Sequence, residues 1–169
     1  CVAKINCACF GLVFSELKEL DDTMISIIVQ MFKEMSDLKK LKYQLEPISL
    51  SELLASRDMR TFIIKNREDK LIAARIIHEH NRYLSDVFAA NSNESRECGA
   101  TYFLIDSLLS LLKREKKLKF DFGRIPPSNN TTDPVYLFKN GSGGRKVQYN
   151  GEWAYYMKES TEYLMFLYR

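Results

Sequence analysis

The chain has 169 residues, of which 46% are hydrophobic and 28% are charged. This length and composition suit one globular domain with a sizeable core and leave little room for two domains. The 25 Lys and Arg against 22 Asp and Glu give a net charge of +3, too small to favour a surface that coats nucleic acid. No apolar run is long enough to span a bilayer, so we expect any membrane contact to be peripheral.

Cysteine usage limits the kind of site that the chain can hold. Cys1, Cys7, Cys9 and Cys98 are unevenly placed and form no Cys-x-x-Cys pair. This pattern favours neither a disulfide framework nor a zinc ribbon. We therefore expect reduced thiols, a cytoplasmic location and no metal site.

The first elements are a helix end, a strand and two helices. Ile5, Ala8 and Gly11 stand at three-residue spacing, which is typical of a helix stopped by glycine, and the start at a cysteine leads us to expect the C-terminal part of a longer chain. Residues 12–14 form a short apolar strand. Asp21 or Asp22 caps a helix whose apolar stripe faces a core. The stripe consists of Met24, Ile27, Ile28, Met31, Phe32 and Met35. After Pro47, the pattern Ser49-x-x-Glu52 predicts a capping box that opens a short helix.

Three strands follow and lead into a βαβ unit. Residues 60–65, 71–79 and 83–90 predict an antiparallel meander, with a charged turn at 66–70. A polar connector at 91–97 then precedes a helix opened by Gly99, and residues 119–123 form the next strand. The order predicts an α/β domain with a mixed, mostly antiparallel sheet flanked by helices.

The start of the helix after Gly99 suits an anionic ligand, because the first backbone N–H groups of a helix have no intrahelical acceptors and the helix dipole is positive there. Arg96 adds a cation, and Gly99 permits close approach. We expect Arg96, Cys98, Gly99 and Ala100 to bind the phosphates of a donor molecule. The alternative is that Gly99 only separates connector from helix.

The last part of the chain is less regular. Residues 124–132 predict a loop, Asp133 and Pro134 open a short helix over 135–140, and glycines follow. Residues 146–149 and 152–157 are strand-like, joined by a hairpin turn or a bulge that the sequence does not decide.

This order of elements resembles the GNAT acyltransferase fold, and the local motifs resemble the FemAB family of peptidoglycan peptidyltransferases and related acyltransferases. The motifs are Lys-Phe-Asp-Phe-Gly at 119–123, Phe-Lys-Asn-Gly-Ser-Gly-Gly at 138–144 with the aromatic strand after it, and the helix, glycine and strand of residues 5–14. The resemblance covers nearly the entire chain.

The resemblance implies an enzyme that transfers an acyl or aminoacyl group to an amine. The donor would be acyl-CoA or aminoacyl-tRNA, with no tightly bound cofactor. The acceptor would be a small-molecule, lipid-linked or peptide amine such as an amino sugar, in cell-wall or glycan biosynthesis.

Two positions depart from the acyl-CoA pattern of the GNAT enzymes. Their signature is Arg/Gln-x-x-Gly-x-Gly/Ala, and this chain has Thr101 in place of the last small residue. Leu137 occupies the position where those enzymes commonly carry a tyrosine general acid, with Tyr136 beside it. An ordinary acyl-CoA N-acetyltransferase is therefore the alternative, and a non-catalytic module that binds a partner through its aromatic C-terminal segment is a second one.

Two residues are our candidates for the chemistry. The resemblance places Lys139 at the acyl-transfer site, where an ammonium stabilises a developing oxyanion. The predicted strand puts Asp86 on one side with Leu84 and Phe88, so we expect a carboxylate with a raised pKa that accepts a proton. A buried partner such as Arg75 would make Asp86 structural instead.

Other polar residues are weaker candidates. Arg124 follows a strand at a sheet edge and is expected to bind an acceptor phosphate or carboxylate, or to be solvated. The resemblance adds Phe138 and Tyr149 to the acceptor site. Asp121 is expected to bond the N–H groups of the loop at Gly123. His78 and His80 lack a third ligand for a metal.

Overall fold

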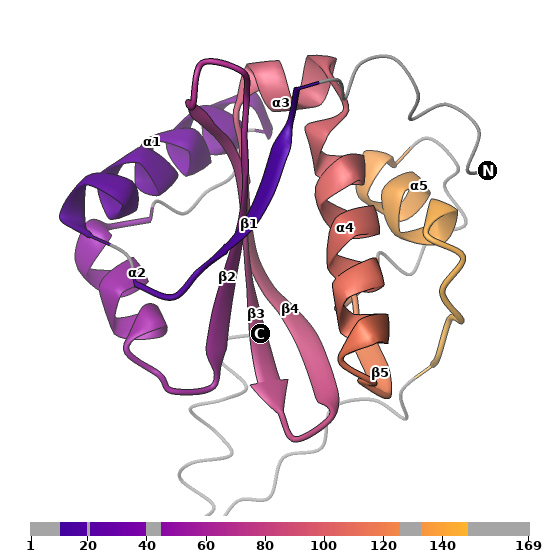
Figure 1. The fold of residues 1–169 in the computed structure, drawn as a ribbon. Helices are drawn as coiled ribbons and strands as arrows, with labels where there is room; N and C mark the ends of the chain where they lie inside the picture. Colours follow the sequence, from indigo (N-terminus) through magenta and orange to yellow (C-terminus); the bar gives the residue numbers. More distant parts are fainter. Residues whose placement is uncertain (1–10, 20, 40–44, 126–132, 149–169) are drawn as a thin grey trace, which may run out of the picture. The chain divides into compact units, whose positions relative to one another are not determined.

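The computed structural model describes residues 11–19, 21–39, 45–125 and 133–148. Contacts divide the chain into two compact units, Cys1–Asn130 and Thr131–Arg169, and whether they form the single domain expected from the sequence stays a prediction. The first unit holds strands β1 to β5 and helices α1 to α4 (Figure 1). Their bounds are β1 Val13–Leu17, α1 Asp22–Lys39, α2 Pro47–Leu54, β2 Met59–Lys65, β3 Leu71–His80, β4 Tyr83–Asn91, α3 Asn93–Glu97, α4 Ala100–Arg114 and β5 Lys119–Asp121.

The sheet keeps the order of the chain, β1-β2-β3-β4-β5. The first four strands pair antiparallel, and β5 pairs parallel to β4 after the crossover through α4. Both the meander and the βαβ unit predicted from the sequence are confirmed. The α/β fold class is therefore the one that the sequence indicates.

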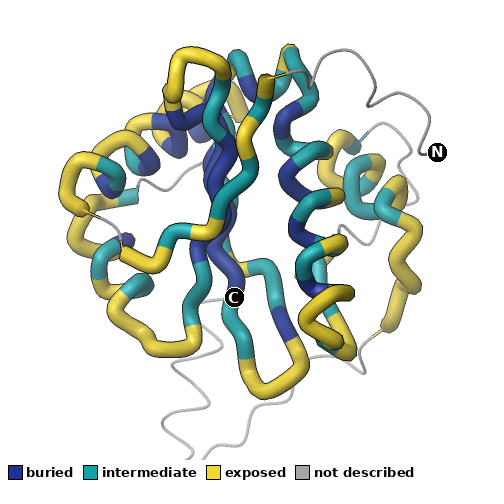
Figure 2. Tube along the Cα trace, in the orientation of Figure 1, coloured by how far each residue is buried: buried dark blue, intermediate teal, exposed yellow. Residues whose placement is uncertain are grey.

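Helices cover both faces of the sheet, and the core lies in two layers between them (Figures 1 and 2). On one face α1 and α2 pack against Ile63, Ala74 and Ile76. On the other face the start of α4 packs against Ile64 and Ile72. No described helix is long and apolar enough to cross a membrane.

Two helix predictions need correction, and a third is confirmed. The buried face of α1 includes Ile25 rather than Ile27, which is 39% exposed. Helix α2 begins at Pro47 with Glu46 as its N-cap, so Ser49 lies inside the helix and opens no capping box. Proline is favoured at the first helical position because the N–H that it lacks would have no partner there. Asp21 caps α1 as expected, accepting from Met24 N at 2.7 Å.

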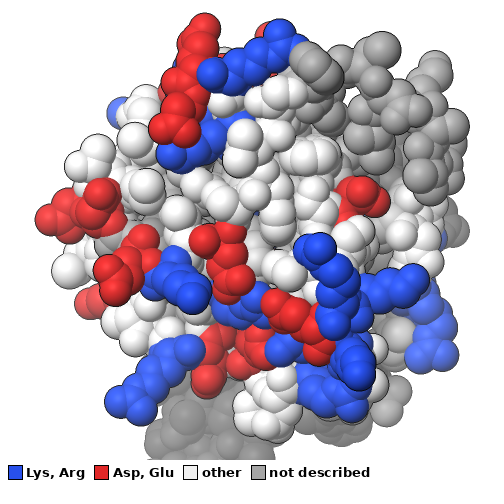
Figure 3. Space-filling model, viewed as in Figure 1, with Lys and Arg blue, Asp and Glu red and all other residues white. Residues whose placement is uncertain are grey.

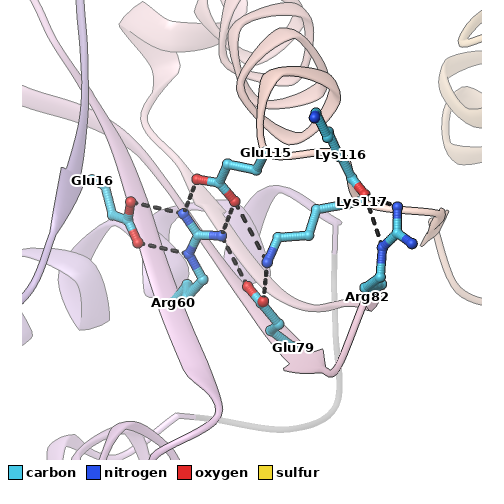
Figure 4. Close-up of polar contacts among 7 residues, drawn as sticks. All are labelled: Glu16, Arg60, Glu79, Arg82, Glu115, Lys116 and Lys117. Carbon is cyan, nitrogen blue, oxygen red and sulfur yellow. Dashed lines mark hydrogen bonds and ion pairs between the residues drawn. The ribbon is translucent and has the colours of Figure 1, made fainter.

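The C-terminal end of α4 is held to the sheet by a cluster of ion pairs, which we call the Arg60 cluster (Figure 4). The Arg60 guanidinium bonds Glu16 at 2.7 and 2.9 Å, Glu115 at 2.7 and 2.9 Å, and Glu79 at 2.9 Å. Lys117 contacts Glu79 and lies 3.7 Å from Glu115. The five side chains come from β1, β2, β3 and the segment after α4, so the cluster joins elements distant in sequence.

Charge pairing shifts the pKa values within the Arg60 cluster. Hydrogen bonds with Glu16 and Glu115 raise the pKa of Arg60, against the effect of burial. Burial raises the pKa of Glu79, but hydrogen bonds from Lys117 and Arg60 outweigh it and the pKa is lowered. The hydrogen bond from Arg60 lowers the pKa of Glu115. These shifts favour the charged forms of Arg60, Glu79 and Glu115 near neutral pH.

A second contact fixes the turn between α4 and β5. Arg82, in the hairpin between β3 and β4, donates through Nε to Lys116 O at 3.0 Å, and its Nη2 lies 2.5 Å from the same oxygen (Figure 4). The Arg82 carbonyl accepts from Leu118 N at 2.9 Å.

Figure 3 shows acidic and basic side chains intermingled over the lower part of the face drawn there. The basic residues Lys113, Arg114 and Lys116 are exposed, as expected of a solvated helix end.

The second unit contains α5, Pro134–Gly141, which confirms the predicted helix. Asp133 caps it, accepting from Val135 N at 2.8 Å and from Tyr136 N at 2.9 Å. Residues 146–148 lie in no strand, contrary to the prediction. Tyr149, residues 152–157 and the predicted helix end at 5–8 lie outside the described residues.

Candidate functional site

Strand β4 extends further than β5, its parallel neighbour in the sheet. Tyr83–Ser85 pairs with Lys119–Asp121, where β5 ends, while β4 continues to Asn91. Beyond Ser85 no described strand pairs with this side of β4. The backbone N–H and C=O groups of residues 87–91 on that side therefore have no ladder partner among the described strands, and such groups can bond an extended ligand.

A bulge in β4 changes the direction of its side chains. Ile76 pairs with Phe88 and Ile77 with Asp86, so Val87 is the extra residue. Phe88 consequently turns to the face of α1, where its ring stacks on Phe32 with 5.3 Å between centroids. The expectation that Phe88 shares a side with Asp86 is wrong, because one inserted residue moves the following side chain to the other face.

Asp86 pairs with Arg75, the buried partner that the sequence offered as an alternative. Arg75 Nη1 donates to Asp86 Oδ2, and the two side chains are only 5% and 12% exposed. Burial lowers the pKa of Arg75, and the charge of Asp86 opposes that effect. This pairing with a buried arginine is the arrangement for which the sequence suggests a structural role of Asp86.

The segment between β4 and α4 is helical rather than an irregular connector. Ser92 caps the five-residue helix α3, accepting from Ser95 N at 3.1 Å. Gly99 then adopts φ 72° and is the N-cap of α4, with no side chain capping that helix. A Cβ added at Gly99 would meet nothing within 4 Å. Tyr102 N already donates to Gly99 O at 3.0 Å, so Ala100 and Thr101 carry the N–H groups that a helix start can offer to an anion.

Two of the predicted phosphate-binding side chains are engaged within this segment. Arg96 Nη1 donates to Asn91 O at 2.9 Å, and Nη2 contacts Asn93 Oδ1. Since a guanidinium carries five N–H donors, further donors remain for a ligand. The Cys98 side chain packs against the buried cluster that includes Ala100, and its Sγ lies 3.8 Å from Ser95 O. Cys98 thus fills space beneath the loop. The positive φ of Gly99 sets the path of the backbone into α4.

Thr101, which departs from the acyl-CoA signature, turns toward β4 and α3. Its hydroxyl donates to Asn91 Oδ1 at 2.8 Å and lies 3.4 Å from Ser95 Oγ. The side chain therefore bonds the loop that supports the helix start. The sequence did not single out Asn91 or Ser95, and their only indication was the polar pattern that caps α3.

The remaining predicted residues are distributed over both units. Arg124 is exposed and follows β5 in the first unit, whereas Lys139 and Phe138 are half-buried on α5 in the second. Asp121 Oδ1 accepts from Gly123 N at 2.8 Å, which confirms its structural role. The described residues contain no group of histidine, cysteine and carboxylate side chains that could hold a metal.

Comparison with known proteins identifies the fold. No family model matches the sequence, and no curated protein matches it. Solved structures do. A possible acetyltransferase from Clostridium difficile 630 superposes with a TM-score of 0.65 at 12% identity, over 87% of this chain and 99% of that one. The aminoglycoside antibiotic 6'-N-acetyltransferase of Acinetobacter baumannii gives a TM-score of 0.60 at 11% identity, over 88% and 100%.

A further match is the ribosomal-protein-S18-alanine N-acetyltransferase of Escherichia coli, with a TM-score of 0.56 at 11% identity over 76% of each chain. The chain thus has the GNAT fold, as its sequence indicates. At these identities the likeness defines the fold alone, and a fold does not fix a reaction. The FemAB resemblance stays a prediction.

Proposed function

We propose that this chain is an N-acyltransferase that takes its acyl group from a coenzyme A thioester and holds the pyrophosphate of that donor at the start of α4. The observation that carries the proposal is the helix start itself. Gly99 leaves it uncapped and open, and Thr101 turns toward Asn91 and Ser95. The threonine that departs from the acyl-CoA signature therefore does not stand in the way of an anion, which we assign to the N–H groups of Ala100 and Thr101.

The unpaired side of β4 supports the same proposal. A CoA donor is an extended molecule with amide groups in its pantetheine arm. On the side of β4 away from β3, residues 87–91 present backbone N–H and C=O groups with no partner from a described strand, and they end at Asn91, one hydrogen bond from Thr101 in the first turn of α4. An extended amide chain can bond such an edge while its phosphates occupy the helix start.

The reaction would be direct transfer. The nitrogen of the acceptor amine attacks the thioester carbon, the C–N bond forms, the C–S bond breaks, and the amine proton ends on the departing sulfur or on solvent. Lys139 is our candidate for stabilising the oxyanion. Because Asp86 is held by Arg75, we assign it to the support of β4 rather than to proton transfer. Aminoglycoside acetyltransferases among the similar folds favour a small-molecule amine as acceptor.

Aminoacyl transfer from tRNA is the second candidate, and the Phe138-Lys139 motif of the FemAB resemblance favours it. A thermal-shift series with CoA, acetyl-CoA and a nonhydrolysable aminoacyl-tRNA mimic separates the two. Ligand at 100 times its Kd adds about 2.7 kcal/mol to the free energy of unfolding. For a chain of this size that raises Tm by roughly 5–10 °C. Stabilisation by the mimic alone would overturn the CoA proposal.

Position 99 offers a matched pair of variants. Asn and Asp both tolerate the left-handed conformation of Gly99, and the open space there accommodates either side chain. Gly99→Asp places a negative charge where the pyrophosphate would lie, whereas Gly99→Asn adds an isosteric neutral group. We expect CoA to stabilise the wild type and Gly99→Asn, and to stabilise Gly99→Asp much less. Equal stabilisation of both variants would exclude the helix start as the phosphate site.

A further inference from the structure

A chain of hydrogen bonds joins the end of β4 to α3 and to the first turn of α4. The Thr101 hydroxyl donates its single proton to Asn91 Oδ1 at 2.8 Å. The contact of 3.4 Å with Ser95 Oγ must then have Ser95 as donor, since a hydroxyl has one proton to give. The direction of the chain is therefore from Ser95 through Thr101 to Asn91.

Each end of this chain is anchored. Ser95 is fully buried, and its backbone N–H bonds Ser92 Oγ in the cap of α3. Asn91 lies opposite Ala73 in the sheet, and its carbonyl accepts from Arg96. Thr101 thus connects the second residue of α4 to two groups that the sheet and α3 already fix.

We propose that Thr101 is a positioning residue for the acyl donor: its hydroxyl holds the first turn of α4 against Asn91 and Ser95, so that the N–H groups of that turn are preorganised for the donor pyrophosphate. This inference rests on the proposed function. It explains how the chain uses a threonine where a small residue would give no side-chain hydrogen bond. Gly99, the N-cap of α4, makes no side-chain hydrogen bond to that first turn.

If Thr101 preorganises the first turn of α4, removing its hydroxyl should weaken CoA binding even at temperatures where the variant is fully folded. In Thr101→Val the shape is kept and the hydroxyl is removed, so Asn91 Oδ1 and Ser95 Oγ lose their partner. We expect the Kd for CoA, measured by titration calorimetry well below Tm, to rise about three- to tenfold. Thr101→Ser keeps the hydroxyl and should restore the Kd to within about twofold of the wild type.

The control is Ser110→Ala, which removes an exposed hydroxyl from the same helix roughly 13 Å further along its axis. It should leave the Kd unchanged. A merely structural Thr101 would lower the Tm of Thr101→Val and leave its Kd for CoA equal to that of the wild type, and that result overturns the inference.

The two proposals fail in different ways. If the wild type binds CoA and Thr101→Val binds it equally, the positioning role is wrong and the proposed function stands. If the wild type does not bind CoA, both are overturned, because the hydroxyl then has no donor to position. A Kd raised equally in Thr101→Val and Thr101→Ser would also refute the role of the hydroxyl, since serine retains it.

Discussion

Replacing Arg60 by methionine should be the most damaging single change in the Arg60 cluster. The guanidinium bonds three carboxylates, two of them through paired hydrogen bonds, and its side chain is only 17% exposed. Methionine retains the apolar stem over Phe62, whose ring centroid lies 5.1 Å from the guanidinium carbon. The substitution therefore removes the charge and its hydrogen bonds while keeping most of the packing.

The magnitude follows from exposure. A hydrogen bond to a charged group contributes about 1.5–3 kcal/mol when it is desolvated. An exposed ion pair contributes only about 0–1 kcal/mol. The partners Glu16, Glu79 and Glu115 are 30%, 20% and 29% exposed, between these limits. Taking about 1 kcal/mol for each carboxylate gives a loss of about 3 kcal/mol in the free energy of unfolding.

Urea unfolding followed by circular dichroism measures this loss, and Tm should fall by roughly 6–12 °C. The matched control is Arg57→Met on the exposed segment after α2, where we expect a change within about 0.5 kcal/mol. Raising the salt concentration to about 1 M shortens the screening length to about 3 Å and should narrow the difference between wild type and Arg60→Met. A loss for Arg60→Met no larger than that for Arg57→Met would refute the reasoning.

Three further predictions concern other parts of the first unit. The pKa of Glu79 is lower in the folded than in the unfolded chain. Its contribution to the free energy of unfolding is therefore complete above about pH 5 and is lost as the pH falls through the lowered pKa. Glu79→Gln should therefore flatten the acid limb of a plot of Tm against pH, and an unchanged limb would contradict this. Asp86→Ala should cost about 3–5 kcal/mol in urea unfolding by leaving Arg75 buried without that carboxylate, and the double variant Arg75→Met with Asp86→Leu should cost less than the single one; a larger cost for the double variant would show that the charges stabilise the fold outright. In Gly11→Ala a new Cβ would lie 2.4 Å from Arg67 Cγ, at φ 89°. Arg67→Ala should relieve the contact but leave about 1–2 kcal/mol of backbone strain in thermal unfolding, and equal losses in both backgrounds would refute the clash.

The sequence predicted the order and type of most elements because their apolar patterns are strong. The strands of the meander, α1, α4 and the crossover to β5 were all visible from periodicity and turn residues. Helix α3 was missed because five polar residues carry no periodicity, and only its cap at Ser92 marks it. The bulge at Val87 was hidden for a related reason: residues 87–90 are all apolar, so no alternation reveals the inserted residue.

The sequence predicted the backbone of the candidate site, a helix start after β4, but not the side-chain contacts around it. Arg96 and Gly99 lie where the βαβ pattern places them, at the start of α4. The contacts of Thr101 with Asn91 and Ser95 depend on how α3 folds back, which no local pattern specifies. The Arg75–Asp86 contact likewise depends on the register of two strands across the bulge. The sequence analysis named this pairing as one alternative for Asp86, but only the register of the two strands decides between that alternative and an unpaired carboxylate.

The order of the sheet bears on how the chain folds. Each described strand from β2 to β5 pairs with the strand before it in the sequence, and β1 to β4 are joined by the α1–α2 connection and two hairpins. For these five described strands, each strand that emerges during synthesis therefore finds the edge it pairs with already formed. Mostly local pairing of this kind favours rapid folding and a short exposure of open edges. We accordingly expect β1 to β4 to form a nascent sheet during synthesis, onto which α4 and β5 are then added.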